Sequence, residues 1–330
     1  MIKNTGLIWE KELADRSPED WILGEANPSK LGRYNEKCVA EIPTKDRIFC
    51  IPEGEIQQSE KGDMCDCANR GPVNILEAKF NWLEGSDLLP PKQKAFLQQF
   101  KNAKGQIEIS DAYVAIKAGN TPQGNSMIAP LDALRTCGIV PKRLMPLEKW
   151  MTWQDYHNPN LITPEIEAIA KESLTLFRFN YERMTTVNDV KTMLNRDIID
   201  LCGWAWPLPE GGIYPRVDYE PNHVFMGLKN SEPDNLIYSC TDIFDNYLDQ
   251  GVEDDFIKRL AADYKFWGQY RIILSYNFTN EEGKEIAIGL MQKLILIIQN
   301  FINEIQKKLG RIFGSKLYKT SFKEWSERSQ

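Results

Sequence analysis

The side chains able to move protons near neutral pH are few, because only His157 and His223 occur among the 330 residues. His223 lies in the segment G-G-I-Y-P-R-V-D-Y-E-P-N-H-V-F-M-G-L, where a short apolar run predicts a strand. His157, in D-Y-H-N-P, falls in a segment that we expect to be a turn-like linker. A base that activates a nucleophile needs that nucleophile within reach and a third group to orient it. The chemistry to look for is therefore nucleophilic catalysis with His223 as the base.

Cys67 is the strongest candidate for the nucleophile. It lies just before a predicted helix, where backbone amides and the helix dipole favour a thiolate. Asp245, in I-F-D-N-Y, follows another predicted strand and is a candidate to orient His223. Cys65 remains an alternative thiol. Taken singly, each residue also has a structural interpretation, because most such cysteines and histidines are buried packing residues and Asp-Asn is typical of turns.

Apolar spacing divides the chain into a helical half and a strand-rich half. The first 60 residues predict an irregular arm with a short strand at 47–51, and a helix begins after Pro72 and ends at Glu84-Gly85. Further helices are expected at about 91–102, 109–118 and 126–137, and strands at 174–179, 224–226, 236–238 and 270–274. Segregation of this kind predicts an α+β fold with an antiparallel sheet.

Composition excludes several classes of function. The net charge is −7 with a pI near 5.2 and no basic block, which argues against nucleic acid as the main partner. Seven cysteines in irregular spacing predict no disulfide framework, and Cys65-Asp66-Cys67 is not a metal-binding pair, so we expect no metal and no cofactor. The N-terminus lacks the apolar run of a signal peptide.

The C-terminal segment carries a heptad seam. Its apolar residues alternate in steps of three and four: Ile288, Met291, Ile295, Ile298, Ile302, Ile305 and Leu309. Polar residues interrupt the segment, so we expect no membrane span. We slightly favour the interpretation that this segment packs on its own domain. The alternative is a helix at 286–309 that joins copies of the chain or binds another component of an assembly.

Several short motifs recur in one order over residues 50–276. They are Glu77, residues 119–125, Gly138-Ile139-Val140-Pro141 with Met145-Pro146, Gly211-Gly212-Ile213-Tyr214, Asn222-His223, Asp245 with Tyr247, and Gly268-Gln269-Tyr270-Arg271-Ile272. In this order they resemble the motifs of papain-like cysteine peptidases. More narrowly, Pro52, Glu55 and Gln57 before Cys67, with Gly71 and Asn74 after it, resemble papain-like proteins of tailed phages.

The resemblance implies a two-lobed papain-like fold and a role for each site residue. Cys67 would attack an amide carbonyl, His223 would transfer the proton, Asp245 would orient His223, and Gln57 would stabilise the oxyanion. The substrate cleft would be lined by Gly124, Asn125, Trp204, Asn222 and Tyr247.

Four parts are expected along the chain: an irregular arm at 1–55, a helical lobe at 56–165, a β lobe at 166–277 and a C-terminal helical extension at 278–330. The predicted function is a cysteine peptidase or amidase acting on a peptide or protein, located in a host cytoplasm or a virion. The alternative is a catalytically silent papain-like structural protein of a virion or other assembly.

Overall fold

The computed structural model describes residues 6–15, 40–51, 57–203, 213–214, 222–230, 234–238, 257–261, 269–276, 291, 295, 298–305 and 307–308. The chain divides into two compact units, Met1–Asn277 and Phe278–Gln330. In the second unit, residues 298–305 are helical. Within the described residues, no helix has the length and apolar character needed to cross a membrane.

Helices dominate the first half of Met1–Asn277, as the sequence predicts. They are α1 (Trp9–Asp15), α2 (Arg47–Cys50), α3 (Cys67–Gly85), α4 (Pro91–Leu97), α5 (Asp111–Lys117), α6 (Ile128–Cys137), α7 (Trp153–Tyr156), α8 (Pro164–Leu176) and α9 (Val187–Arg196). Side-chain caps begin several of them: the hydroxyl oxygens of Ser110, Thr163 and Thr186 accept backbone N–H bonds at the starts of α5, α8 and α9.

A seven-stranded sheet forms the second half, with strand order β3-β9-β4-β6-β7-β8-β5. Its strands are β3 (Phe177–Met184), β4 (Ile199–Gly203), β5 (Ile213–Tyr214), β6 (His223–Asn230), β7 (Asp234–Tyr238), β8 (Ile257–Ala261) and β9 (Gln269–Tyr276). All pairings are antiparallel except that of β5 with β8. A short hairpin, β1 (Gln58–Ser59) with β2 (Gly62–Asp63), lies apart from this sheet. The predicted α+β class, helical first and antiparallel afterwards, is confirmed.

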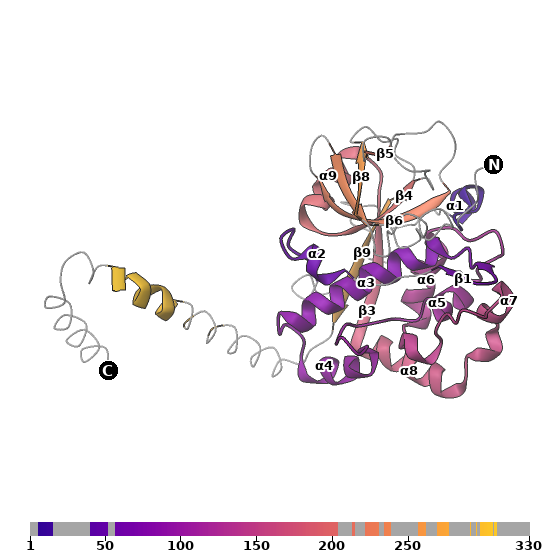
Figure 1. Cartoon of the computed structure of the whole chain (residues 1–330), viewed down its shortest axis with the longest axis horizontal. Helices are drawn as coiled ribbons and strands as arrows, with labels where there is room; N and C mark the ends of the chain where they lie inside the picture. The colour runs from indigo at the N-terminus through magenta and orange to yellow at the C-terminus, as the bar shows by residue number, and fades with distance from the viewer. Residues whose placement is uncertain are drawn as a thin grey trace, which may run out of the picture. The chain divides into compact units, whose positions relative to one another are not determined.

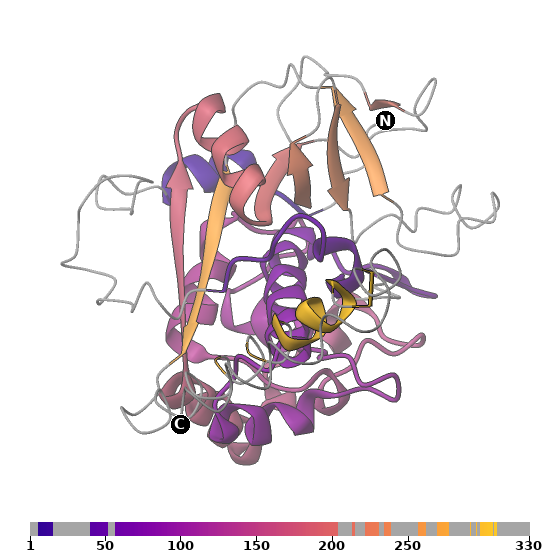
Figure 2. The same ribbon diagram turned by 90° about the vertical axis from the view of Figure 1, so that its left-hand side faces the viewer.

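Figures 1 and 2 show the arrangement within this unit: α3 runs past β9, with α4, α5, α6 and α8 on one side and the strands β4, β6 and β8 on the other. Helix α3 packs against β4, β6 and β9 as well as against α5 and α6. Its residues from Cys67 to Phe80 are all buried. A helix buried on every side must satisfy its polar groups inside the protein.

Three local predictions are wrong, and two of them concern a predicted strand. Residues 47–50 form helix α2 rather than a strand, because Arg47 is buried and donates to the carbonyls of Ile42, Leu194 and Leu228, which are far apart in sequence. Helix α8 continues to Leu176, so β3 begins only at Phe177, because Ile166, Ala170 and Ser173 form a buried helical face.

Helix α3 also begins earlier than predicted, at Cys67 rather than after Pro72. Proline inside a helix removes one amide donor and costs about 3 kcal/mol. The first turn compensates, because the amides of Asn69 and Arg70 both donate to the Asp66 carbonyl, at 2.8 and 3.0 Å. The Arg70 Nε also donates to Asp66 Oδ1 at 2.8 Å, which fixes this turn from the side.

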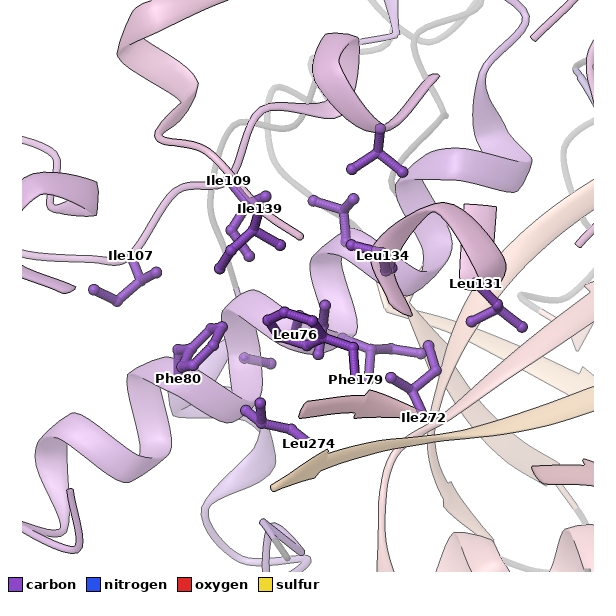
Figure 3. Close-up of a cluster of buried hydrophobic side chains, with 14 of the residues drawn as sticks. Leu76, Phe80, Ile107, Ile109, Leu131, Leu134, Ile139, Phe179, Ile272 and Leu274 are labelled. Carbon is purple, nitrogen blue, oxygen red and sulfur yellow. The ribbon is translucent and has the colours of Figure 1, made fainter. Parts of the chain in front are cut away.

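The hydrophobic core joins α3 to both halves of the unit. Figure 3 shows Leu76 and Phe80 of α3 among Ile107, Ile109 and Ile139 on one side and Phe179, Ile272 and Leu274 of the sheet on the other. Phe80 meets the Phe177 ring edge-on with centroids 4.9 Å apart. Such pairs contribute about 1 kcal/mol beyond the area they bury.

A buried ion pair ties the middle of α3 to the sheet and to the N-terminal arm. Lys79 contacts Asp197, and both side chains are inaccessible to solvent. Lys79 Nζ also donates to the Ala40 carbonyl at 2.6 Å, and Asp197 Oδ1 accepts from the amides of Ile42 and Ile198. Burial lowers the pKa of Lys79, and the Asp197 carboxylate opposes that shift. The charged pair is tolerated because its hydrogen-bonding capacity is used.

We expect Lys79→Met to lower the free energy of unfolding by about 3–5 kcal/mol, because Asp197 would remain buried without its cation. Urea unfolding followed by circular dichroism measures the change. The matched control is Lys94→Met, which breaks an exposed pair with Asp87 and should cost at most about 1 kcal/mol. Equal losses in the two variants would show that the buried pair has no special role.

Candidate active site

Cys67 is the first residue of α3 and is fully buried. It follows Asp66, whose backbone carbonyl accepts the amides of the first helical turn. The N-terminal end of a helix carries partial positive charge, which stabilises a nearby anion such as a thiolate. The structure therefore places Cys67 at a helix start, and its role as a nucleophile stays a prediction.

A buried charge network fixes the start of α3. Arg70 pairs with Asp66 at 2.8 Å and with Asp111 of α5 at 3.2 Å. The Tyr156 hydroxyl, at the end of α7, donates to Asp66 Oδ2 at 2.9 Å. Burial raises the pKa of Tyr156 well above its usual range, so the phenol stays protonated and acts as a donor. This network was not predicted from the sequence, although the spacing of Asp66 and Arg70 on one helical face could have indicated it.

His223 is the first residue of β6, opposite Gly203 of β4, and it is fully buried. The residue after it, Val224, packs on Gly71, one turn after Cys67. A Cβ built on Gly71 would lie 2.7 Å from Val224 Cγ1. Only glycine allows this close approach of helix and strand. The start of α3 and the start of β6 are thereby brought together, although Cys67 and His223 are far apart in the sequence.

Gln57 is buried near the residues that precede Cys67. The β1–β2 hairpin connects Gln57 to these residues, because the Met64 amide donates to the Gln57 carbonyl at 3.2 Å. The Gln57 side-chain amide donates to Asp63 Oδ1 at 2.6 Å, and the Cys65 amide donates to the same oxygen at 2.7 Å. Asp63 therefore orients both Gln57 and the segment that leads into α3.

The loop at residues 119–125 also contacts the segment that leads into α3. Thr121 and Gly124 close a turn through two backbone bonds, and the Asn120 side chain donates to the Cys65 carbonyl at 3.2 Å. His157 lies in a turn after α7, as the sequence predicts, and its Nε2 is 2.9 Å from Asn120 Nδ2. His157 caps α7, is buried and stacks on the Trp153 ring, and burial lowers its pKa.

An N-terminal segment, residues 6–8, covers the loop residue Asn125. The Asn125 amide donates to the Gly6 carbonyl and the Ile8 amide donates to the Asn125 carbonyl, both at 2.8 Å. A Cβ on Gly6 would lie 2.4 Å from the Cys65 carbonyl oxygen, and one on Gly124 would lie 2.1 Å from the Gly6 oxygen. The backbone amide and carbonyl of Asn125 are therefore both paired with this segment.

Glu77 connects α3 to the segment that precedes α5. Its Oε1 accepts the Ile109 amide at 2.6 Å, and Ile109 bridges to Pro141. The motif residues around 77 and 138–141 are thus joined to each other through the segment before α5.

Buried polar groups without partners lie at the interface of α3 with the sheet. In the part of the chain that the structure describes, neither carboxyl oxygen of Asp200 and no side-chain polar atom of Asn74 has a hydrogen-bond partner. Asp200 Oδ1 would lie 2.4 Å from a Cβ on Gly71. Burial raises the pKa of Asp200 well above its usual range, and nearby Glu12 raises it further, so both favour the protonated carboxyl.

Other predicted site residues fall in two groups. Asn222 is partly buried and directly precedes His223. Asp245, Trp204 and Tyr247 lie outside the described residues, so their placement stays a prediction.

The described thiols differ in their surroundings. Burial raises the pKa of Cys50 to about 11, which keeps it protonated at neutral pH. Cys65 is partly exposed and has a left-handed backbone with φ of 52°. Among the described residues, no cluster of His, Cys, Asp and Glu could hold a metal ion.

No protein-family model matches the sequence, and no curated protein sequence is significantly similar to it. The chain is similar in structure to xylellain, a cysteine protease from Xylella fastidiosa, with 11% identity, a TM-score of 0.43 and coverage of 85% of this chain and 98% of that one. It is also similar to the Carica candamarcensis cysteine protease CMS1MS2, with 8% identity, a TM-score of 0.40 and coverage of 73% and 99%. A third similar structure is procathepsin L 3 of Tenebrio molitor larval midgut, with 10% identity, a TM-score of 0.42 and coverage of 82% and 76%. At TM-scores this low the likeness carries no argument about chemistry, which must come from the residues of this chain.

Asp200→Asn tests the buried carboxyl behind the site. The pKa of Asp200 is raised in the folded state. Its carboxyl therefore stabilises the fold at pH values below the unfolded pKa of about 3.9, and this contribution is lost as the pH rises through the folded pKa. We therefore expect the variant, which is neutral at every pH, to match the wild type near pH 4 and to exceed its stability increasingly above that pH. Urea midpoints at pH 4, 6 and 8 measure the difference. A difference that is the same at all three values would show that Asp200 does not titrate in this way.

Proposed function

We propose that the protein is a papain-like cysteine peptidase or amidase that cleaves a peptide-type amide bond, with Cys67 as the nucleophile and His223 as the base. The observation that carries the proposal is the packing of Gly71 on Val224, which draws the start of the Cys67 helix to the start of the His223 strand. A nucleophile at a helix N-terminus with a base on a neighbouring strand is a workable catalytic pair.

The reaction would proceed in two balanced steps. The Cys67 sulfur attacks the amide carbonyl, the C–N bond breaks, and His223 passes the thiol proton to the leaving amine, which leaves a thioester. Water, deprotonated by His223, then attacks the thioester, and the proton returns to the Cys67 sulfur as the acid leaves. The Gln57 amide and the Cys67 backbone N–H would stabilise the oxyanion, at roughly 3 kcal/mol per donor. Asp245 would orient His223, and Trp204 and Tyr247 would line the cleft with Gly124, Asn125 and Asn222.

A second candidate function is a catalytically silent structural role in a virion or other assembly. It is favoured by the burial of both Cys67 and His223 and by the pairing of residues 6–8 with Asn125. The phage origin, with a location in host cytoplasm or virion, rests on Gly71, Asn74 and the Pro52–Gln57 motif and is part of the proposal.

Alkylation of cysteines tests the nucleophile. With iodoacetamide at pH 6, we expect Cys67 to react at least about tenfold faster than Cys50, because a thiolate paired with an imidazole is already ionised. The modified positions are identified by peptide mass spectrometry over a time course.

His223→Ala should remove the rapid reaction of Cys67, while His157→Ala serves as the matched control that removes the other histidine. Uniformly slow reaction of the described cysteines in the wild type would favour the silent structural role.

Substitution of Gly6 tests whether the N-terminal segment limits access to Cys67. Gly6→Ala adds a methyl group that clashes with the Cys65 carbonyl at a residue whose φ is +116°, so the segment should be displaced. We expect faster alkylation of Cys67 in this variant.

Gly105→Ala is the matched control, because Gly105 also has a positive φ but a Cβ there would meet nothing within 4 Å. If both variants alkylate at the wild-type rate, residues 6–8 do not control access to the thiol.

A further inference from the structure

A buried contact between His157 and Asn120 joins the turn after α7 to the loop at residues 119–125. His157 Nδ1 is 2.9 Å from the Trp153 carbonyl oxygen, and His157 Nε2 is 2.9 Å from Asn120 Nδ2. A carbonyl oxygen only accepts hydrogen bonds, so Nδ1 must carry a proton. An amide nitrogen only donates, so Nε2 must accept. The imidazole at this contact is therefore neutral.

The same Asn120 amide group also holds the segment that leads into α3. Its Nδ2 donates to the Cys65 carbonyl at 3.2 Å and to the Met64 carbonyl at 3.5 Å. The opposite orientation of the amide group would place Oδ1 against these two carbonyl oxygens, which are also acceptors. Oδ1 is buried and, within the residues that the structure describes, has no hydrogen-bond partner.

Protonation of His157 would set two donors against each other, Nε2–H of the imidazolium and the Nδ2 hydrogens of Asn120. Rotation of the Asn120 amide by half a turn removes this conflict, because Oδ1 then accepts from Nε2–H. The same rotation takes Nδ2 away from the Cys65 carbonyl. We propose that His157 and Asn120 form a proton-sensitive latch, which holds the Cys65 carbonyl while the imidazole is neutral and releases it when the imidazole is protonated.

The charged and titratable groups around His157 come from several elements. Burial lowers the pKa of His157, the Asp66 carboxylate before α3 opposes this shift, and Arg70 of α3 adds to it. Tyr156 of α7 meets the His157 ring edge-on and donates to Asp66, while Asp111 of α5 pairs with Arg70. The latch therefore opens only in acid, below the ordinary histidine pKa of about 6.5.

An NMR titration of the full chain tests the latch, because His157 and His223 are the only histidines and His157→Gln identifies the His157 signal. In the wild type we expect the Nδ1–H tautomer at pH 8 and a titration midpoint below the ordinary value of about 6.5. Asn120→Asp replaces the donor beside Nε2 with a carboxylate and should raise that midpoint. Asn160→Asp adds the same charge at an exposed residue close in sequence and should leave the midpoint nearly unchanged.

Three results of this titration would overturn the proposal. They are an Nε2–H tautomer, a midpoint at or above the ordinary histidine value, and a His157 that stays neutral until the whole chain unfolds in acid. Equal midpoints in Asn120→Asp and Asn160→Asp would also count against it, because Asn120 would then not face the titrating nitrogen.

Hydrogen–deuterium exchange tests whether protonation releases the segment before α3. The amides of Met64 and Cys65 report on this segment, because they donate to the Gln57 carbonyl and the Asp63 carboxylate. One pH unit below the titration midpoint, we expect these amides to exchange about fivefold faster in the wild type than in His157→Gln, a factor that corresponds to one lost hydrogen bond. The glutamine offers Asn120 an acceptor and cannot be protonated.

At pH 8 the wild type and His157→Gln should exchange alike, and comparison at equal pH removes the intrinsic pH dependence of exchange. Equal exchange in the two proteins at both pH values would show that His157 does not control this segment. Neither measurement requires a reactive Cys67, so failure of the latch is distinguishable from failure of the catalytic proposal.

Discussion

The fold depends on the burial of a charged helix. Helix α3 carries Arg70 and Lys79, both inaccessible to solvent, and each requires an anion inside the protein. Arg70 finds its anions at Asp66 and on α5, at Asp111. Lys79 finds Asp197, at the entry to β4. One cation thus fixes α3 to the helical half and the other to the sheet, and the register of the helix between the two halves follows from both.

This constraint explains which features the sequence could predict. The helices α4, α5 and α6 and the strands β6, β7 and β9 follow from local periodicity, which a single sequence shows. The start of α3 does not, because the local rule against Pro72 is outweighed by contacts of Asp66 and Arg70. Helix α2 could not be predicted for the same reason. Arg47 donates to the carbonyls of Leu194 and Leu228, which lie near it only in the folded chain.

The features of the candidate site also divide into those that the sequence indicates and those that only the fold reveals. Residue types and order make Cys67, His223 and the Gly124–Asn125 loop candidates, and the fold brings the helix start, the strand start and the loop into one region. No sequence pattern indicates that His157 is buried against Asn120, because that contact joins two loops. Nor could the sequence indicate that Gly6 lies against Cys65, since the N-terminal arm has no periodic signal.

The N-terminal arm links access to the site with the core behind it. The segment that pairs with Asn125 continues into α1, where Glu12 is fully buried. Glu12 accepts from the Tyr270 hydroxyl at 2.5 Å and from the Met127 amide at 2.8 Å, and its charge raises the pKa of Asp200. Lifting the arm would leave two buried donors unpaired, at a cost of about 1–3 kcal/mol each. Residues 6–8, which pair with Asn125, therefore lead into a helix that is anchored in the core through Glu12.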